Sequence, residues 1–328
     1  FEQVDPHLGT TQEFSDLVAD AHARGMKVFM DIITNHTADV IQLEGNAGYR
    51  DKTDFPYTDV DGNEFDDSDF AYYGQPTYDF PEVNVDSFPY RPVVPSDAKF
   101  PDWLDDPLLY HNRGDSSFVG ENSLYGDFFG LDDLWTERKE VVEGMIDVYK
   151  HWIQAYGVDG FRIDTTKHVN MEFWQKFGPD ILAEARVQGI DHFFAFGEVY
   201  DEQYGPSFLS EFSTRGQLQS TIDFAFQAAA RDFASRSGST DALRDFFRDD
   251  DYYTDADSNA YALPTFIGNH DRGRVGWFLD ADHGGALDDD EKLARSRLAH
   301  ALMYFARGVP VVYYGDEQGF VGDGGDKD

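Results

Sequence analysis

The sequence has no cysteine and no long apolar run, and it is poor in cationic residues. Without cysteine, disulfides and thiol catalysis are excluded, and the redox compartment is left open. No run of about 18 apolar residues occurs, so no membrane-spanning helix is predicted. Only 26 Lys and Arg stand against 63 Asp and Glu. This deficit argues against nucleic acid or an anionic membrane as a partner, because phosphate binding needs clustered cations.

What the chain does contain is a large apolar fraction under an acidic surface. Its 328 residues are 41% hydrophobic, which predicts a globular protein with a substantial core. The formal net charge of -37 comes from acids scattered through every segment, so it describes a surface coat and not a tail. Salt with a Debye length of about 3 Å at 1 M would screen the self-repulsion. We therefore expect a protein adapted to high salt, and a neutral substrate is compatible with this coat.

Residues 157–168 form the stretch on which the functional prediction centres. Residues 158–163 are short and mostly apolar, and they predict a buried strand. Arg162 and Asp164 stand at alternate positions, so their side chains point to the same face, where each can compensate the other. A structural ion pair is one interpretation of these two charges. A catalytic pair is the other, since catalytic residues lie at the carboxyl ends of barrel strands.

Helical and strand patterns alternate along the chain. Helices are predicted over 11–24, 134–156, 171–187, 241–248 and 290–307, and strands over 26–33, 158–163, 192–198, 220–226, 261–267 and 309–314. Such alternation predicts an α/β fold with a parallel sheet, and the number of units favours a partial (β/α)8 TIM barrel. An open doubly wound sheet is the alternative, but no Gly-rich phosphate loop follows any predicted strand.

The periodicity fails between residue 37 and about residue 132. This segment is dense in Asp, Tyr, Phe, Pro and Gly, and it is far too long for a loop inside a compact barrel. We therefore predict three parts: residues 1–36 as the first part of the barrel, residues 37–132 as an irregular inserted domain after the third strand, and residues 133–328 as the second part of the barrel.

Three predicted strands end in a carboxylate. Glu198 follows Asp164 by about one βα unit, and Asp271 follows Glu198 by about two, at roughly 30 or more residues each. On a barrel these three acids would meet at one rim, where they cannot all be ionised comfortably. Glycoside hydrolysis requires one ionised and one protonated carboxyl group. A site for a divalent cation, built from these acids and two histidines, is the alternative.

Several motifs together resemble the α-amylase family of glycoside hydrolases. Four segments are similar to the family's four signature regions, in order: 31–36 (DIITNH), 160–168 (GFRIDTTKH), 197–199 (GEV) and 269–271 (NHD). Residues 131–134 resemble its short motif late in the inserted domain, residues 308–317 its last barrel strand, and residues 4–10 the segment before its second helix. The resemblance covers essentially the whole chain.

The resemblance implies a role for each acid. Asp164 would be the nucleophile, held ionised by Arg162, and would form a covalent glycosyl intermediate. Glu198 would give a proton to the leaving oxygen and then take one from the incoming water. Asp271 would bind sugar hydroxyls and stabilise the oxocarbenium-like transition state.

The resemblance also implies residues that bind the substrate. His36 and His270 would bind the sugar in the cleaved subsite together with Arg162, while Lys167 and His168 would line the leaving-group side. For each histidine, a structural side chain in the core is the alternative interpretation.

A structural calcium ion is the cofactor that the resemblance implies. Asn35, Asp133 and the backbone carbonyl of His168 would bind it and join the inserted domain to the barrel. Oxygen ligands of this kind suit calcium.

The expected function is retaining endohydrolysis of α-1,4-glucans, with an α-glucan polysaccharide or a maltooligosaccharide as the substrate. A transglycosylase, or a hydrolase of α-1,4- or α-1,6-linked oligosaccharides, is the alternative within the family, and a non-catalytic carbohydrate-binding scaffold is the alternative outside it. The polymer substrate implies an extracellular location, although a cytoplasmic one is left open. The family's first strand and C-terminal β-sandwich are missing, so we expect an interior piece of a longer protein.

Overall fold

The computed structural model describes residues 1–71, 79–95, 98–200 and 205–324. The chain divides into two compact units, Phe1–Glu198 and Val199–Asp328, and each is described by itself. The predicted three-part organisation remains a prediction. In the described part of the chain, no helix is both long and apolar enough to cross a membrane.

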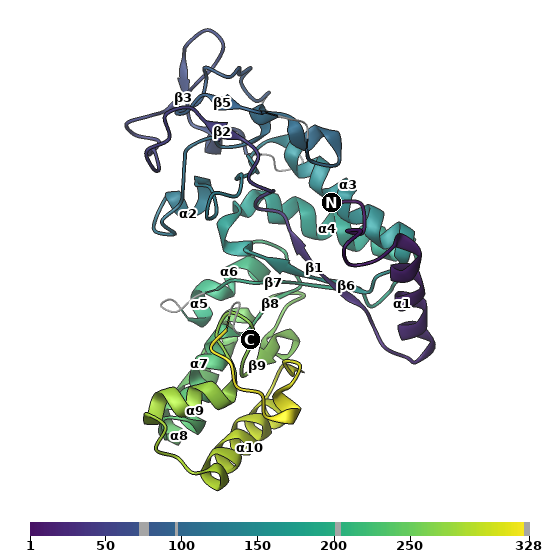
Figure 1. Ribbon diagram of the computed structural model, residues 1–328, viewed down its shortest axis with the longest axis vertical. Coiled ribbons are helices and arrows are strands. Elements are labelled where there is room, and N and C mark those ends of the chain that lie inside the picture. The colour runs from purple at the N-terminus through teal and green to yellow at the C-terminus, as the bar shows by residue number, and fades with distance from the viewer. Residues whose placement is uncertain (72–78, 96–97, 201–204, 325–328) are drawn as a thin grey trace. The chain divides into compact units, whose positions relative to one another are not determined.

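Three parallel strands lie side by side in the first unit: β1 (Phe29–Ile33), β6 (Gly160–Asp164) and β7 (Phe194–Gly197), with β6 in the middle (Figure 1). The register places Asp31 opposite Arg162. Gly160 is required by this close packing, because an added Cβ would collide with the carbonyl oxygen of Phe194. The carboxyl ends of the three strands therefore meet at one edge of the sheet.

The helices α1 (Thr11–Ala23), α3 (Lys139–Tyr156) and α4 (Met171–Val187) belong to the same unit. Thr10 and Glu13 form the capping box that starts α1. Gly157 ends α3 in the left-handed region, with a φ of 66°. The sequence of α3 predicts an apolar stripe that ends at Tyr156, which is half-buried, and the other five residues of the stripe are buried: Val142, Met145, Ile146, Tyr149 and Ile153. The helix begins five residues later than predicted, because residues 134–138 form a buried irregular segment.

The segment between β1 and α3 is built of short elements, as its irregular sequence suggests. The strands β2 (Gln42–Leu43) and β5 (Pro92–Val93) form one antiparallel pair, and β3 (Tyr57–Thr58) and β4 (Glu64–Phe65) form another. Its helical turns are η1 (Asp67–Phe70), η2 (Asp102–Asp105), η3 (Pro107–Leu109) and α2 (Asn122–Tyr125). A small aromatic core of Tyr57, Phe88 and Trp135 holds this region together.

In the second unit, β9 (Pro264–Phe266) pairs in parallel with β10 (Val309–Val311). Its helices pack around a core that includes Phe226, Ile267, Leu279 and Met303. The longer helices are α7 (Phe224–Ala234), α8 (Thr240–Arg248), α9 (Val275–His283) and α10 (Asp289–Phe305). The shorter elements are α5 (Pro206–Leu209), α6 (Glu211–Thr214), β8 (Ser220–Thr221), η5 (Asp249–Tyr253), η6 (Ala260–Ala262) and η7 (Asp316–Gln318).

One predicted strand is wrong over most of its length. The sequence pattern predicts an extended segment over 220–226, but β8 is only two residues long and α7 begins at Phe224. The reason is Asp223, whose buried carboxylate accepts the backbone N–H of Phe226 at 2.9 Å and caps the helix. Asp223 also pairs with Arg307, which compensates its charge. The alternation of Phe224 and Phe226 is therefore the first turn of a helix.

Candidate active site

The guanidinium of Arg162 is the centre of the site at the strand ends. Its Nη1 donates to Asp31 Oδ1 at 2.8 Å and to Asp164 Oδ1 at 2.5 Å, and its Nη2 lies 3.0 Å from Glu198 Oε1. Burial lowers the pKa of Arg162, but the attraction of these three carboxylates is stronger, so the pKa is raised overall. The predicted pair of Arg162 and Asp164 is present, and one permanent cation serves three acids.

The backbone around Thr165 fixes Glu198. Glu198 Oε2 accepts the N–H of Thr165 at 3.1 Å, and the carbonyl of Glu198 accepts the N–H of Thr166 at 3.0 Å. Thr165 itself has a φ of 52°, in the left-handed region that a β-branched residue seldom adopts. The side chain of Glu198 is 7% exposed, whereas that of Asp164 is 24% exposed. Glu198 is therefore the sheltered carboxylate and Asp164 the accessible one.

Two of the predicted substrate-binding histidines flank one phenylalanine. The ring of His36 stacks on Phe128 with centroids 5.0 Å apart, and the ring of His168 meets Phe128 edge-on at 5.2 Å. His168 Nδ1 lies 2.6 Å from the carbonyl oxygen of Ser123. Burial lowers the pKa of His36, although the charge of Asp164 opposes this, and burial lowers the pKa of His168 to about 4. Both rings are neutral near pH 7.

Three further predicted residues are Lys167, His270 and Asp271. Lys167 is half-buried in the turn η4 (Thr166–His168) that follows β6. Asp271 and His270 belong to the second unit, on the loop after β9, where Asn269 Oδ1 accepts the backbone N–H of Asp271 at 3.2 Å. The meeting of Asp271 with the other two acids therefore remains a prediction.

An aromatic cluster beside the histidines is not among the residues predicted from the sequence. Phe118 lies 4.8 Å from Phe129 and 5.8 Å from His168, measured between ring centroids. Phe129 is 80% exposed, and its φ of 54° lies in the left-handed region. A bulky residue in a strained conformation with an exposed ring points to a role outside the core. No local pattern marks this cluster, because aromatic residues are frequent throughout this region.

Two of the three predicted calcium ligands are in contact. Asn35 Nδ2 donates to Asp133 Oδ1 at 3.0 Å, and the N–H of Leu134 donates to the carbonyl of Asn35 at 2.9 Å. Both predicted side chains are buried. The third predicted ligand, the carbonyl of His168, remains a prediction.

A further buried acid, Asp127, lies beside Asp133. Asp127 Oδ1 accepts the backbone N–H of Asp133 at 3.3 Å. Burial raises the pKa of each of these two acids to about 7. A cation would relieve the cost of ionising both, and their oxygen donors suit calcium, so the residues fit the predicted ion. Nothing in the motif singles out Asp127, which lies six positions before Asp133.

Comparison with known proteins gives a match over the full length. Residues 1–327 match the model of the alpha amylase catalytic domain family. The chain is 52% identical to an alpha-amylase from Streptomyces lividans over 332 aligned positions, covering 100% of this chain and 36% of that protein. It is 26% identical to a cyclomaltodextrin glucanotransferase from Bacillus licheniformis, covering 99% of this chain and 37% of that protein. The chain thus spans about a third of the length of these relatives.

Solved structures give the same result. The chain matches an alpha-amylase from Geobacillus thermoleovorans, complexed with acarbose, with a TM-score of 0.68 and 25% identity, over 98% of this chain and 57% of that chain. It matches an alpha-amylase from Anoxybacillus with a TM-score of 0.67 and 27% identity, over 99% of this chain and 56% of that chain. These likenesses and the parallel strands confirm the predicted α/β TIM-barrel fold class.

Proposed function

The chain belongs to the alpha-amylase family, and from this premise we propose that it hydrolyses internal α-1,4-glucosidic bonds of starch-like glucans with retention of configuration. The observation that carries the proposal is the guanidinium of Arg162, which lies within 3.0 Å of carboxylate oxygens of both Asp164 and Glu198. Two acids on one cation are close enough to act on a single sugar linkage, and their unequal exposure suits unequal roles.

In the first step, an ionised oxygen of Asp164 attacks the anomeric carbon while the bond to the leaving oxygen breaks. The leaving oxygen takes a proton from Glu198. In the second step, Glu198 takes a proton from water, the water oxygen attacks the anomeric carbon, and Asp164 is released. Arg162 stabilises the negative charge that each acid carries when it is deprotonated.

The other residues would bind and orient the sugar. Asp271 would hydrogen-bond sugar hydroxyls, with His270 beside it, and would stabilise the positive charge of the transition state. His36, neutral and buried next to Phe128, can donate or accept a hydrogen bond without a change in charge. Lys167 and His168 would line the leaving-group side.

Calcium would act on the fold and not on the chemistry. Asn35 and Asp133, with the carbonyl of His168, would hold the ion, and Asp127 adds a fourth group beside Asp133. Because Asn35 follows the end of β1 by two residues and Asp133 comes from the far end of the inserted segment, the ion would tie that segment to the sheet. The ion would supply positive charge to buried carboxylates, as calcium sites do.

Product analysis from soluble starch in high salt tests the proposal. We expect short maltooligosaccharides and a rapid rise in reducing ends. The Asp164→Asn variant should lose about 10⁴-fold or more in kcat, because the nucleophile is removed while the side chain keeps its shape. Substantial turnover by that variant would refute the nucleophile assignment, and binding of starch without new reducing ends would indicate a carbohydrate-binding scaffold.

Transglycosylation is a second candidate, because a cyclomaltodextrin glucanotransferase is among the relatives. The same covalent intermediate could pass its glucan to a sugar hydroxyl instead of water. Cyclic or elongated products without a matching rise in reducing ends would favour this reaction.

The proposed substrate also bears on where the protein acts. A polymeric glucan is too large to enter a cell, so a protein that hydrolyses it would act outside the cell.

A further inference from the structure

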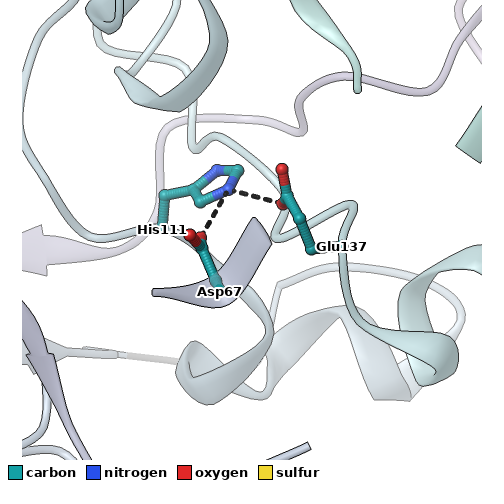
Figure 2. Close-up of side chains that lie close together, drawn as sticks. All are labelled: Asp67, His111 and Glu137. Carbon is teal, nitrogen blue, oxygen red and sulfur yellow. Dashed lines mark hydrogen bonds and ion pairs between the residues drawn. The ribbon is translucent and has the colours of Figure 1, made fainter. Parts of the chain in front are cut away.

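A second group of buried polar side chains lies in the first unit. Three of these side chains converge on one point (Figure 2). They are Asp67, the first residue of η1, His111, which follows η3, and Glu137, which precedes α3. His111 Nε2 lies 3.0 Å from Glu137 Oε2 and 4.0 Å from Asp67 Oδ2. One potential ligand atom from each residue lies within 4.8 Å of the others. All three side chains are at most 2% exposed.

The other nitrogen of His111 fixes its orientation. Nδ1 lies 2.7 Å from Asp133 Oδ2, and the backbone N–H of His111 donates to the carbonyl of Asp133 at 3.0 Å. When Asp133 is ionised, as bound calcium would favour, its carboxylate only accepts hydrogen bonds, so Nδ1 carries the hydrogen and the Nε2 lone pair is directed at Glu137 and Asp67. A histidine held this way by a carboxylate is the usual arrangement of a metal ligand.

Asp67 is also held in place by neighbouring groups. Its Oδ2 accepts the indole N–H of Trp135 at 2.7 Å, and its Oδ1 pairs with the ammonium of Lys52. Lys52 itself is shared with Asp66, at 3.0 Å. One ammonium therefore serves two acids, while Glu137 is paired with His111.

We propose that Asp67, His111 and Glu137 bind a divalent transition-metal ion, with Zn²⁺ as the best-suited ion, at a site separate from the calcium site. One imidazole and two carboxylates form a ligand set that zinc uses, with water in a remaining position. The imidazole argues against magnesium and calcium, which prefer oxygen.

A proton on Nε2 is the competing explanation, but it accounts for less of the geometry. A single N–H can be directed at Glu137 at 3.0 Å, whereas Asp67 at 4.0 Å lies beyond hydrogen-bond distance. A metal ion placed between the three atoms would satisfy both acids at once. Lys52, which pairs with Asp67, also lines a surface cavity together with Phe65, Asp66 and Arg113.

The site is tested by metal content, so the outcome does not depend on the proposed glucan hydrolysis. The full chain is stripped with a chelator, refilled with excess calcium, and titrated with ZnCl2 by calorimetry, with elemental analysis of the dialysed product. We expect one zinc per chain with calcium retained. Glu137→Gln and Asp67→Asn should each weaken zinc affinity by at least about 100-fold, since loss of a supporting group alone costs 10- to 100-fold.

His7→Gln is the matched control, because the His7 side chain is 93% exposed and its ion pair is with nearby Asp5. It should bind zinc as the natural chain does. Absence of bound zinc, zinc binding that survives in both ligand variants, or zinc that displaces the calcium would each overturn the proposal. If Glu137→Gln fails to fold, the zinc affinity of Asp67→Asn tests the proposal instead. This variant should fold, because an asparagine oxygen can still accept the N–H of Trp135.

Discussion

Two groups of acids in the first unit surround a basic side chain, but they differ in their access to water. At the strand ends, Asp31 and Asp164 share Arg162, and their side chains are 58% and 24% exposed. In the second group, Asp133 and Glu137 contact His111, and none of these side chains is more than 2% exposed. Carboxylates that water and a ligand can reach are able to take part in a reaction. Carboxylates that are fully desolvated depend on fixed partners, so they control stability.

The largest expected effect is on activity at the strand ends. Glu198→Gln removes the group that transfers protons but retains an acceptor for the N–H of Thr165. We expect kcat to fall by about 10²- to 10⁴-fold, the usual contribution of general acid–base catalysis. The thermal midpoint should change little. Initial rates on soluble starch and a melting curve of the same preparation measure both.

Glu184→Gln is the control for this substitution, because Glu184 lies on the surface of α4 with Gln154 and Gln188 as its partners. Its activity should equal that of the natural chain. A Glu198→Gln variant that loses stability but keeps its turnover would show that the strand-end acids are structural.

For His111→Leu we expect a loss of stability with little change in activity. This change leaves Asp133 and Glu137 buried without their shared partner, which typically destabilises a protein by about 3–5 kcal/mol. Urea unfolding should show the loss, while the turnover rate of the folded protein at low temperature stays within a few-fold of its natural value. If turnover instead fell about 100-fold while stability was retained, the distinction between the two groups would be contradicted.

These two groups cannot be predicted equally well from the sequence. Arg162 and Asp164 stand out because two charges occupy alternate positions of an otherwise apolar strand, and strand pleating then fixes their common direction. His111 is a lone histidine in an irregular segment. Its partners, Asp67 and Glu137, lie 44 positions before it and 26 after it, and no periodic pattern connects positions so far apart. Only tertiary folding brings them together.

The same contrast holds for the fold. Helices with an apolar stripe and a glycine stop, such as α3, can be predicted to within a few residues. The helix α7 cannot, because two phenylalanines in alternation resemble a strand, and the cap at Asp223 competes with that pattern. The helix α9 is also absent from the predicted elements, since its sequence is apolar on several sides and lacks a side-chain cap.

Removal of calcium should have the next largest effect, which is a loss of thermal stability whose size depends on pH. In the metal-free protein, burial raises the pKa of Asp127 and of Asp133 to about 7, above the unfolded values near 4. The folded state then binds more protons than the unfolded state between about pH 4 and 7, so its stability falls as pH rises through this range. Calcium favours the ionised acids and removes this loss.

We therefore expect calcium to raise the thermal midpoint more at pH 8 than at pH 5. At a concentration of 100 times its Kd, calcium would raise the free energy of unfolding by about 2.7 kcal/mol. Melting curves with calcium and with chelator at both pH values measure the difference. In Asp133→Asn, the calcium-dependent rise should largely disappear; an unchanged rise would place the ion elsewhere.

Salt should act on the exposed acids and leave the buried group unaffected. With a formal net charge of -37, the natural chain should gain stability between low and multimolar NaCl, and each kcal/mol gained raises the thermal midpoint of a chain of 328 residues by roughly 1–2 °C. The destabilisation by His111→Leu should persist at high salt, because desolvated pairs are screened little. Equal midpoints at both salt concentrations would refute the predicted adaptation to salt.

The smallest effect is expected at Phe129, which is exposed although it is large and apolar. Its ring lies 5.2 Å from Phe128, which in turn contacts both His36 and His168, the two histidines predicted to bind the substrate. An exposed ring that stacks on a sugar contributes about 1 kcal/mol. Phe129→Ala should therefore raise KM about fivefold and leave kcat nearly unchanged. Because the residue has a φ of 54°, Phe129→Gly should be at least as stable as Phe129→Ala while showing the same KM, and this separates sugar contact from backbone strain.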